Sequence, residues 1–177
     1  GCRFCAAGFA CRPARFRSAA TLAGSFARGI ENKKRIGLLG TAVSDHPELA
    51  ALCSAILDRK GRAAVGSLRI DRVDAHIAAL LKRSGVETVA LAPEAGTQRL
   101  RDVIRKGITE EQILAAAGTL ASEGILKIRL YFMVGLPTET DEDVEAVIHL
   151  SRAVRDYALQ CCTGKKPLQR LTLSINQ

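Results

Sequence analysis

The feature that most constrains this chain is a repeated alternation of short apolar runs with longer amphipathic segments. The strand-length apolar runs lie at residues 36–40, 63–70, 86–91, 127–134 and 170–175. Helical patterns lie before and between them, at residues 19–30, 47–60, 71–84, 98–105, 109–123 and 140–157. Strand, turn and helix units with short connections pair their strands in parallel through right-handed crossovers. The sequence therefore predicts an α/β fold whose strands are covered on both faces.

Two architectures fit this alternation, an open doubly wound sheet and an open or closed β/α barrel. Both place ligands at the carboxyl ends of the strands. In this chain the predicted strand ends are polar or contain glycine, at residues 40–45, 67–69, 93–97, 135–140 and 174–176. We expect these segments to form the rim of a ligand site.

The composition is that of a soluble globular protein. Of 177 residues, 47% are hydrophobic and 25% are charged, which suits one domain with a sizeable core. No apolar run approaches the roughly 20 residues that a membrane span requires, so no membrane partner is expected. The six cysteines are too few and too irregularly spaced for a disulfide scaffold. A reducing cytoplasm is the expected location.

The cysteines that carry a pattern stand at the start of the chain, in the stretch from Gly1 to Phe9. Cys2 and Cys5 have C-x-x-C spacing, which can place two thiolates on one metal centre. A zinc site would need a second ligand pair, and none follows at ribbon or finger spacing. A dithiol redox pair should open a helix, which Gly8 and the later proline disfavour. Cys11 is either a third ligand in a variant spacing or an uninvolved thiol.

The net charge of +8 is concentrated around this cysteine loop. Residues 1–35 hold eight of the 26 basic residues but only one of the 18 acidic residues. Such a field suits an anionic partner, whether an iron–sulfur cluster with thiolates, a carboxylate-bearing cofactor or a nucleic acid backbone. An aromatic content of 4% disfavours the stacking platforms that single-stranded nucleic acids use.

Several of these segments together resemble one enzyme family. Cys2-Arg-Phe-Cys5 is similar to the second half of the C-x-x-x-C-x-φ-C loop of radical SAM enzymes, in which φ is aromatic and three thiolates bind a [4Fe-4S] cluster. Pro93-Glu-Ala-Gly-Thr97 and Lys106-Gly107 resemble the segments after the fourth strand and the following helix of that family. Met133-Val-Gly-Leu-Pro-Thr-Glu139 resembles its fifth-strand segment.

The resemblance spans nearly the whole chain and is greatest to the Elongator/methylthiotransferase-like branch. Within that branch, CRFCAAGF, GTAVSDHP and LYFMVGLPTETDEDVEAV look like bacterial radical SAM proteins that carry a cobalamin-binding-type domain upstream. The resemblance implies a partial, open TIM-type barrel, (β/α)6-like with its first strand missing. Residues 1–177 would form one core domain, with the cluster loop at 1–17 and the β/α units at 18–177.

For the cluster, the resemblance implies that Cys2 and Cys5 are two of three ligands. The first cysteine would lie four residues before Cys2, beyond the start of this sequence. We therefore expect a fragment of a longer protein that is inactive alone. Phe4 would pack beside the adenine of S-adenosylmethionine.

For the cofactor, Glu94 would accept a hydrogen bond from a ribose hydroxyl, or would instead cap the helix beginning near Gln98. Lys106 or Arg69 would pair with the methionyl carboxylate, a charge-assisted contact. Ser67, at the same strand end as Arg69, is a further candidate contact.

The fifth-strand segment would hold adenine through the backbone of Gly135, Leu136 and Pro137. Glu139 would either contact the cofactor or orient the loop. At the second strand end, where the family carries Gly-Gly-Glu, this sequence reads Gly40-Thr-Ala. Thr41 or Ser44 would replace the missing carboxylate at the methionyl amine.

Two functional hypotheses follow. The first is a radical SAM enzyme core that reductively cleaves S-adenosylmethionine to a 5'-deoxyadenosyl radical, or transfers methyl groups with cobalamin. Its substrate is open, and its electron donor would be a protein such as flavodoxin or ferredoxin. The second is a non-catalytic basic β/α domain that binds nucleic acid through residues 1–35.

Overall fold

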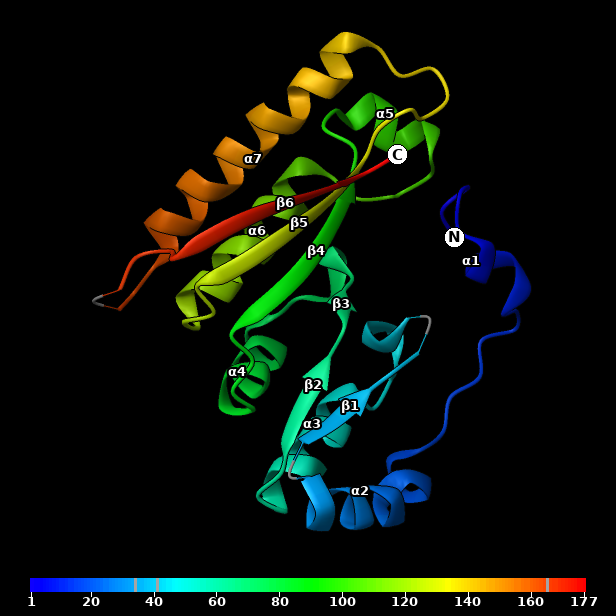
Figure 1. Ribbon diagram of the computed structural model, residues 1–177, viewed down its shortest axis with the longest axis vertical. Helices are drawn as coiled ribbons and strands as arrows, with labels where there is room; N and C mark the ends of the chain where they lie inside the picture. The colour runs from blue at the N-terminus through cyan, green and yellow to red at the C-terminus, as the bar shows by residue number, and fades with distance from the viewer. Residues whose placement is uncertain (34, 41, 165) are drawn as a thin grey trace.

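The structure, a computed structural model, describes residues 1–33, 35–40, 42–164 and 166–177 (Figure 1). Every strand pair in this part of the chain is parallel. The strands are β1 (Arg35–Leu38), β2 (Arg62–Val65), β3 (Ser67–Leu68), β4 (Thr88–Glu94), β5 (Lys127–Met133) and β6 (Arg170–Asn176). β1 pairs with β2, and the larger sheet has the order β3-β4-β5-β6. Neighbouring strands therefore follow one another in chain order.

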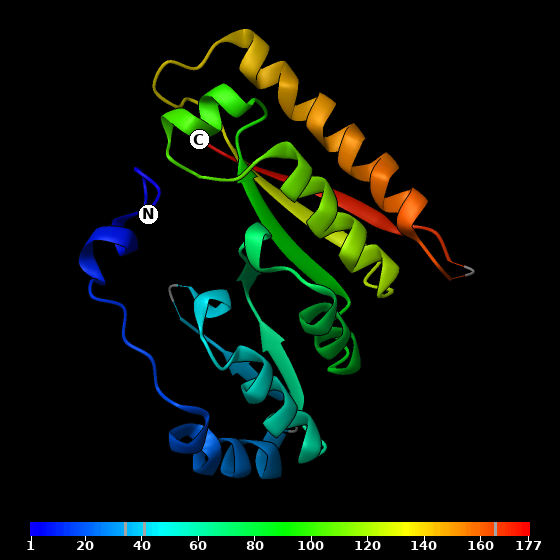
Figure 2. The ribbon, with the colours of Figure 1, turned by 180° about the vertical axis from the view of Figure 1, so that it is seen from behind.

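The helices that connect the strands form one layer. They are α3 (Leu49–Asp58), α4 (Ala75–Arg83), α6 (Glu110–Ser122) and α7 (Asp141–Cys161). Contacts link α3 to α4, α4 to α6 and α6 to α7, and this layer lies on one side of the strands in Figure 2. Sequential strand order under one helix layer is the arrangement of part of a β/α barrel, since a doubly wound sheet has helices on both faces. The predicted partial barrel is confirmed.

The remaining helices are shorter or lie at the edges of this layer. They are α1 (Ala6–Ala10), α2 (Ala19–Lys33), α5 (Gln98–Val103) and the 3-10 turns η1 (Val43–Asp45) and η2 (Ile70–Arg72). α1 lies on the side toward which the strand arrows point (Figure 1). None of the described helices combines the length and the apolar character needed to cross a bilayer.

Three local predictions were wrong. The strand predicted over 63–70 divides at Gly66 into β2 and β3, so the described strands form two sheets. The helix predicted from residue 71 begins at Ala75, because Asp74 accepts a hydrogen bond from the Ile77 N–H at 2.7 Å and caps it there. The cysteine loop contains α1 despite Gly8, since Cys5 caps this helical turn.

The core lies between the larger sheet and the helix layer. β4 and β5 alternate fully buried residues with partly exposed ones, and Leu91, Leu130 and Phe132 are inaccessible to solvent. The prediction of strands covered on both faces was therefore wrong, because one helix layer covers only one face. A smaller apolar cluster lies at the carboxyl ends of the strands, beneath α5. It consists of Ala95, Leu100, Ile104 and Leu136.

Gly96 is required where β4 leads into α5. A Cβ at this position would lie 2.4 Å from the Val147 backbone nitrogen, so α7 leaves no room for a side chain. We expect Gly96→Ala to lower the free energy of unfolding by about 1–3 kcal/mol through overpacking. Urea denaturation would measure it. Gly37→Ala is the matched control, because nothing lies within 4 Å of a Cβ there; equal losses in the two variants would contradict the packing argument.

Candidate active site

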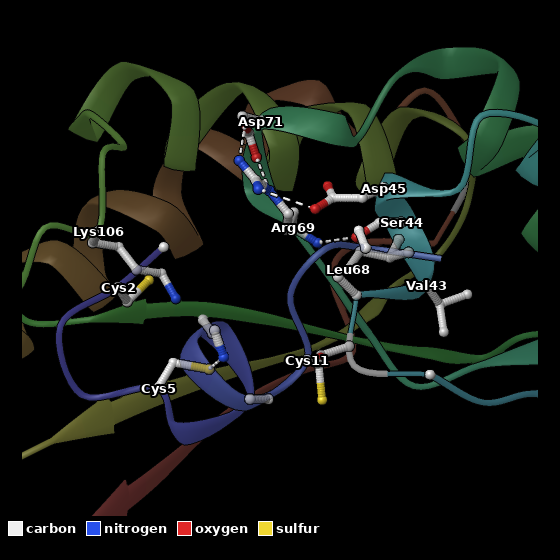
Figure 3. Close-up of a pocket in the computed structure, with 18 of the residues that line it drawn as sticks. Cys2, Cys5, Cys11, Val43, Ser44, Asp45, Leu68, Arg69, Asp71 and Lys106 are labelled. Atoms are coloured by element: carbon white, nitrogen blue, oxygen red, sulfur yellow. Dashed lines mark hydrogen bonds and ion pairs between the residues drawn. The ribbon is translucent and has the colours of Figure 1, made fainter. Parts of the chain in front are cut away.

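A cavity of about 1130 Å³ opens at the carboxyl ends of the strands. One wall is the cysteine loop, and the opposite wall is formed by the segments that follow β1 and β3. Glu94 at the end of β4 and residues 105–108 after α5 complete the lining. Figure 3 shows Cys2, Cys5 and Lys106 on one side and Arg69 with its aspartates on the other. This volume slightly exceeds the range of about 300–1,000 Å³ that is usual for ligand sites.

The two predicted cluster cysteines lie together in this cavity. Cys2 and Cys5 are both half-buried and free. The Cys5 sulfur accepts a hydrogen bond from the Gly8 N–H at 3.4 Å, at the start of α1. Hydrogen bonds to cysteine sulfur are among the contacts by which proteins set the reduction potential of iron–sulfur clusters. The loop thus places two thiols at the cavity wall with one sulfur already bonded by the backbone.

Cys11 lines the same cavity but follows the last residue of α1. It is exposed, and in Figure 3 its sulfur lies apart from those of Cys2 and Cys5. Within residues 1–33, 35–40, 42–164 and 166–177, no group of three or more His, Cys, Asp or Glu side chains could hold a metal ion.

Cys53 is buried in the core, where burial raises its pKa to about 11.

Glu94 lies at an irregularity at the end of β4. Leu91 pairs with Leu130, but Glu94 pairs with Phe132, so β4 carries one extra residue at its end. Glu94 has a φ of 71°, a left-handed conformation that is uncommon for a residue with a side chain and often marks a functional site. Its Oε1 lies 3.0 Å from Lys106 Nζ, and both side chains are more than four-fifths buried. Thr97, rather than Glu94, caps α5.

The opposite wall holds Arg69 between two carboxylates. Arg69 donates to both oxygens of Asp71, at 3.0 and 2.6 Å, and to Asp45 at 3.2 Å. These carboxylates, Asp71 first, raise the pKa of Arg69, and Arg69 lowers that of Asp71. Ser44 is buried and accepts a hydrogen bond from the Arg69 N–H at 3.0 Å. The guanidinium is therefore held by partners from two strand ends.

Other predicted residues divide between this cavity and its surroundings. Phe4, Gly40 and Ser67 line the cavity, and Thr41 lies outside the described residues. The segment after β5 does not contribute to the lining among the described residues.

The β5 segment instead packs against α5 and closes on itself. Leu136 is buried in the small apolar cluster, whereas Gly135 and Pro137 are exposed. Glu139 accepts a hydrogen bond from the Gly135 N–H. Its carboxylate therefore fixes the loop from within.

A buried carboxylate joins this segment to α5. Asp143, in the first turn of α7, is 2% exposed and accepts hydrogen bonds from Thr97 and Arg99. It also accepts from the Thr140 N–H at 3.0 Å. These contacts, that of Thr97 first, lower the pKa of Asp143 to about 2.

Sequence reasoning missed several residues around the cavity. Arg69 has two partners, Asp45 in the predicted rim segment 40–45 and Asp71 at the start of a predicted helix, but nothing in the sequence links either of them to Arg69. Arg3 was visible between the two cysteines, but its partners on α5 are about 100 residues away. Only the tertiary structure reveals such contacts.

The partial barrel and its cysteine-lined cavity agree with the family to which the sequence is matched. The model of the radical SAM superfamily matches residues 1–151. The chain belongs to the radical SAM superfamily. This radical SAM domain is 35% identical over 177 residues to the uncharacterized protein MJ0966 of Methanocaldococcus jannaschii, covering 99% of this chain and 37% of that protein.

Other similarities cover less or are more distant. The uncharacterized methyltransferase PH0819 of Pyrococcus horikoshii is 33% identical over 93 residues, which is 52% of this chain and 20% of that protein. Residues 1–177 thus span little more than a third of the length of MJ0966. The structure of coproporphyrinogen III oxidase (HemN) from Escherichia coli, a radical SAM enzyme, aligns with a TM-score of 0.58. The two sequences are 13% identical, and the alignment covers 89% of this chain and 37% of the HemN chain. This similarity supports the assignment of a partial β/α barrel.

The Asp143 network makes a pH-dependent contribution to stability. Because its folded pKa lies below the ordinary value for Asp, the stabilisation is complete above about pH 4 and is lost as the pH falls toward 2. We expect Asp143→Asn to cost about 2 kcal/mol at pH 7 and to weaken the acid dependence of urea unfolding. Asp141→Asn is the control, an exposed carboxylate on the same turn; an unchanged pH profile in Asp143→Asn would contradict this assignment.

Proposed function

We propose that this domain binds a [4Fe-4S] cluster and S-adenosylmethionine in the 1130 Å³ cavity and cleaves the latter reductively. The observation that carries the proposal is that the cysteine loop and the buried Glu94–Lys106 pair line one cavity. The cluster and S-adenosylmethionine together supply a 5'-deoxyadenosyl radical when an electron is delivered. The protein supplies ligands, orientation and exclusion of water.

The donor set fits a cluster in part. Cys2 and Cys5 would each ligate one iron through a thiolate, and three thiolates leave the fourth iron open for the methionyl group. The described residues offer two ligands on this loop, and the relative MJ0966 is much longer than 177 residues. We therefore propose that the third thiolate comes from a part of the protein outside residues 1–177, and that residues 1–177 alone are inactive.

The polar contacts of the cavity suit S-adenosylmethionine. Glu94 would accept from a ribose hydroxyl, and Phe4, which is 41% exposed, would pack beside the adenine. Lys106 is better placed than Arg69 for the methionyl carboxylate, because an ammonium has three donors and Lys106 uses one for Glu94. Arg69 already serves two carboxylates.

The remaining predicted contacts take less direct roles in this proposal. Ser44 and Ser67 offer hydroxyls on the wall opposite the cysteines, and Gly40 lets a ligand approach the backbone there. Gly135, Leu136 and Pro137 would present backbone to adenine beyond the rim of the cavity. Glu139 holds that loop in shape.

For the whole protein, we propose an enzyme with an external electron donor such as flavodoxin or ferredoxin. A substrate class does not follow from the cavity, since exposed arginines at 12, 15 and 17 would also attract nucleic acid. The relative PH0819 is named as a methyltransferase, which favours methyl transfer as the reaction. Cobalamin for that transfer would be held on another domain. The six free cysteines suit the reducing cytoplasm.

Anaerobic iron and sulfide reconstitution tests the cluster. The experiment uses the full-length protein, including any residues encoded before Gly1. We expect four irons per chain and reductive cleavage of S-adenosylmethionine. Cys2→Ala and Cys5→Ala should lose both, because each removes a thiolate ligand. Cys11→Ala is the control and should keep both, since its exposed sulfur lies apart from the pair.

A colourless wild-type protein without iron would contradict the proposed function. Nucleic acid binding that falls steeply with salt and persists in Cys2→Ala and Cys5→Ala would instead favour the basic binding module.

Lys106→Met tests the cofactor contact. We expect iron content to be unchanged and S-adenosylmethionine binding to weaken roughly 10- to 100-fold, since a charge-assisted contact is lost. Equilibrium dialysis would measure the affinity. Lys127→Met is the matched control, because Lys127 pairs with Glu87 at 2.6 Å far from the cavity lining. Equal affinities in both variants would remove Lys106 from the site.

A further inference from the structure

Arg3, between the two cysteines, is bonded to the end of α5. Its backbone N–H donates to the Ile104 carbonyl at 2.9 Å, and its Nη1 donates to the Val103 carbonyl at 2.6 Å. These carbonyls belong to the last turn of α5, where helix carbonyls have no partner within the helix. A cationic side chain is a favourable partner for them.

These two bonds are the main attachment of the cysteine loop. Within residues 1–16, which are all described, the other recorded hydrogen bonds join neighbours in the loop and α1. The next attachment lies at Phe16 and Arg17: the Phe16 ring meets the His46 ring edge-on with centroids 5.2 Å apart, and the Arg17 carbonyl lies 3.0 Å from His46 Nε2. Between Arg3 and that point, residues 9–15 are exposed. The position of the loop therefore depends on the contact of Arg3 with α5.

The same turn of α5 presents Lys106 to Glu94. The Lys106 N–H donates to the Arg101 carbonyl at 2.8 Å, and Arg105 and Gly107 on either side have left-handed φ values of 57° and 67°. This backbone path directs Lys106 back toward Glu94 at 3.0 Å. One turn thus contacts the cysteine loop through its carbonyls and the cofactor pair through Lys106.

The turn itself is fixed from the inside. Ile104 is 3% exposed, and Arg101 is 1% exposed and donates to the carbonyls of Ala95 and Gly96, next to Glu94. A turn held this firmly can act as a fixed reference for a loop that has few contacts of its own.

We infer that Arg3 is a positioning residue, which sets the distance and orientation of the cysteine loop relative to the Glu94–Lys106 pair. This inference rests on the proposed function and adds a residue that itself touches neither iron nor S-adenosylmethionine. A reacting centre depends on such placement, because displacements of about 1 Å can cost about 100-fold in rate. Loss of Arg3 should therefore weaken the cofactor contact before it prevents cluster assembly.

The test compares Arg3→Ala, Arg3→Lys and Arg15→Ala in the full chain. Arg15 is the matched control, an exposed arginine in the same segment with no recorded side-chain partner among the described residues. In the iron-free protein, we expect amide hydrogen exchange at residues 2–5 to rise about tenfold in Arg3→Ala, as loss of one charge-assisted hydrogen bond implies. Arg15→Ala should match the wild type.

In the reconstituted protein, we expect Arg3→Ala to keep its iron but to bind S-adenosylmethionine about tenfold more weakly. The change that S-adenosylmethionine causes in the electron paramagnetic resonance spectrum of the reduced cluster should also diminish. Arg3→Lys should recover most of both, because an ammonium can still donate to the Val103 carbonyl.

Arg3→Ala with wild-type exchange and wild-type affinity would overturn the inference. So would a loss of iron alone, with wild-type affinity in the molecules that retain a cluster, since Arg3 would then serve only assembly. Failure of the wild-type protein to take up iron would overturn the proposed function instead. Hydrogen exchange would still decide whether Arg3 fixes the loop.

Discussion

The buried guanidinium of Arg101 is the contact on which the site end of this fold depends. It is the largest of the fully buried side chains, and burial lowers its pKa. Placing a cation there is costly unless hydrogen bonds satisfy it. Arg101 offsets part of this cost by donating from Nη1 and Nη2 to Ala95, Gly96 and Gln98, while its Nε has no hydrogen-bond partner among the described residues. These bonds join α5 to the segment that follows β4.

Two other polar contacts extend this arrangement outward. Asp143 joins the start of α7 to Thr97 and Arg99 at the start of α5. Arg3 attaches the cysteine loop to the other end of α5. Charged side chains therefore join the six-residue helix α5 to the end of β4, the start of α7 and the cysteine loop. They are needed because so short a helix buries little apolar surface. The cavity lies where these connections meet.

The sequence was most informative where the determining contacts are local. The β/α alternation predicted the parallel strands and the helix at 109–123, where a capping box of Thr109 and Gln112 begins α6. The break at Gly66 could not be foreseen, because 63–70 reads as one apolar run. That Cys2 and Cys5 share a cavity with Glu94 and Lys106 was implied by the family resemblance alone. The partners of Arg3, Arg101 and Asp143 were not implied, since a charged residue carries no mark of its distant partner.

The segment after β5 shows how a motif can be placed correctly while its immediate contacts differ from expectation. Leu136 packs with Ala95, Leu100 and Ile104 rather than lining the cavity among the described residues. That packing supports the turn from which Lys106 reaches Glu94 and to which Arg3 is bonded. Glu139 keeps Leu136 in place by closing the loop on the Gly135 N–H. The segment thus supports the cavity through α5, and its effect on the cofactor pair passes through apolar contacts that no spacing of polar residues in the sequence reveals.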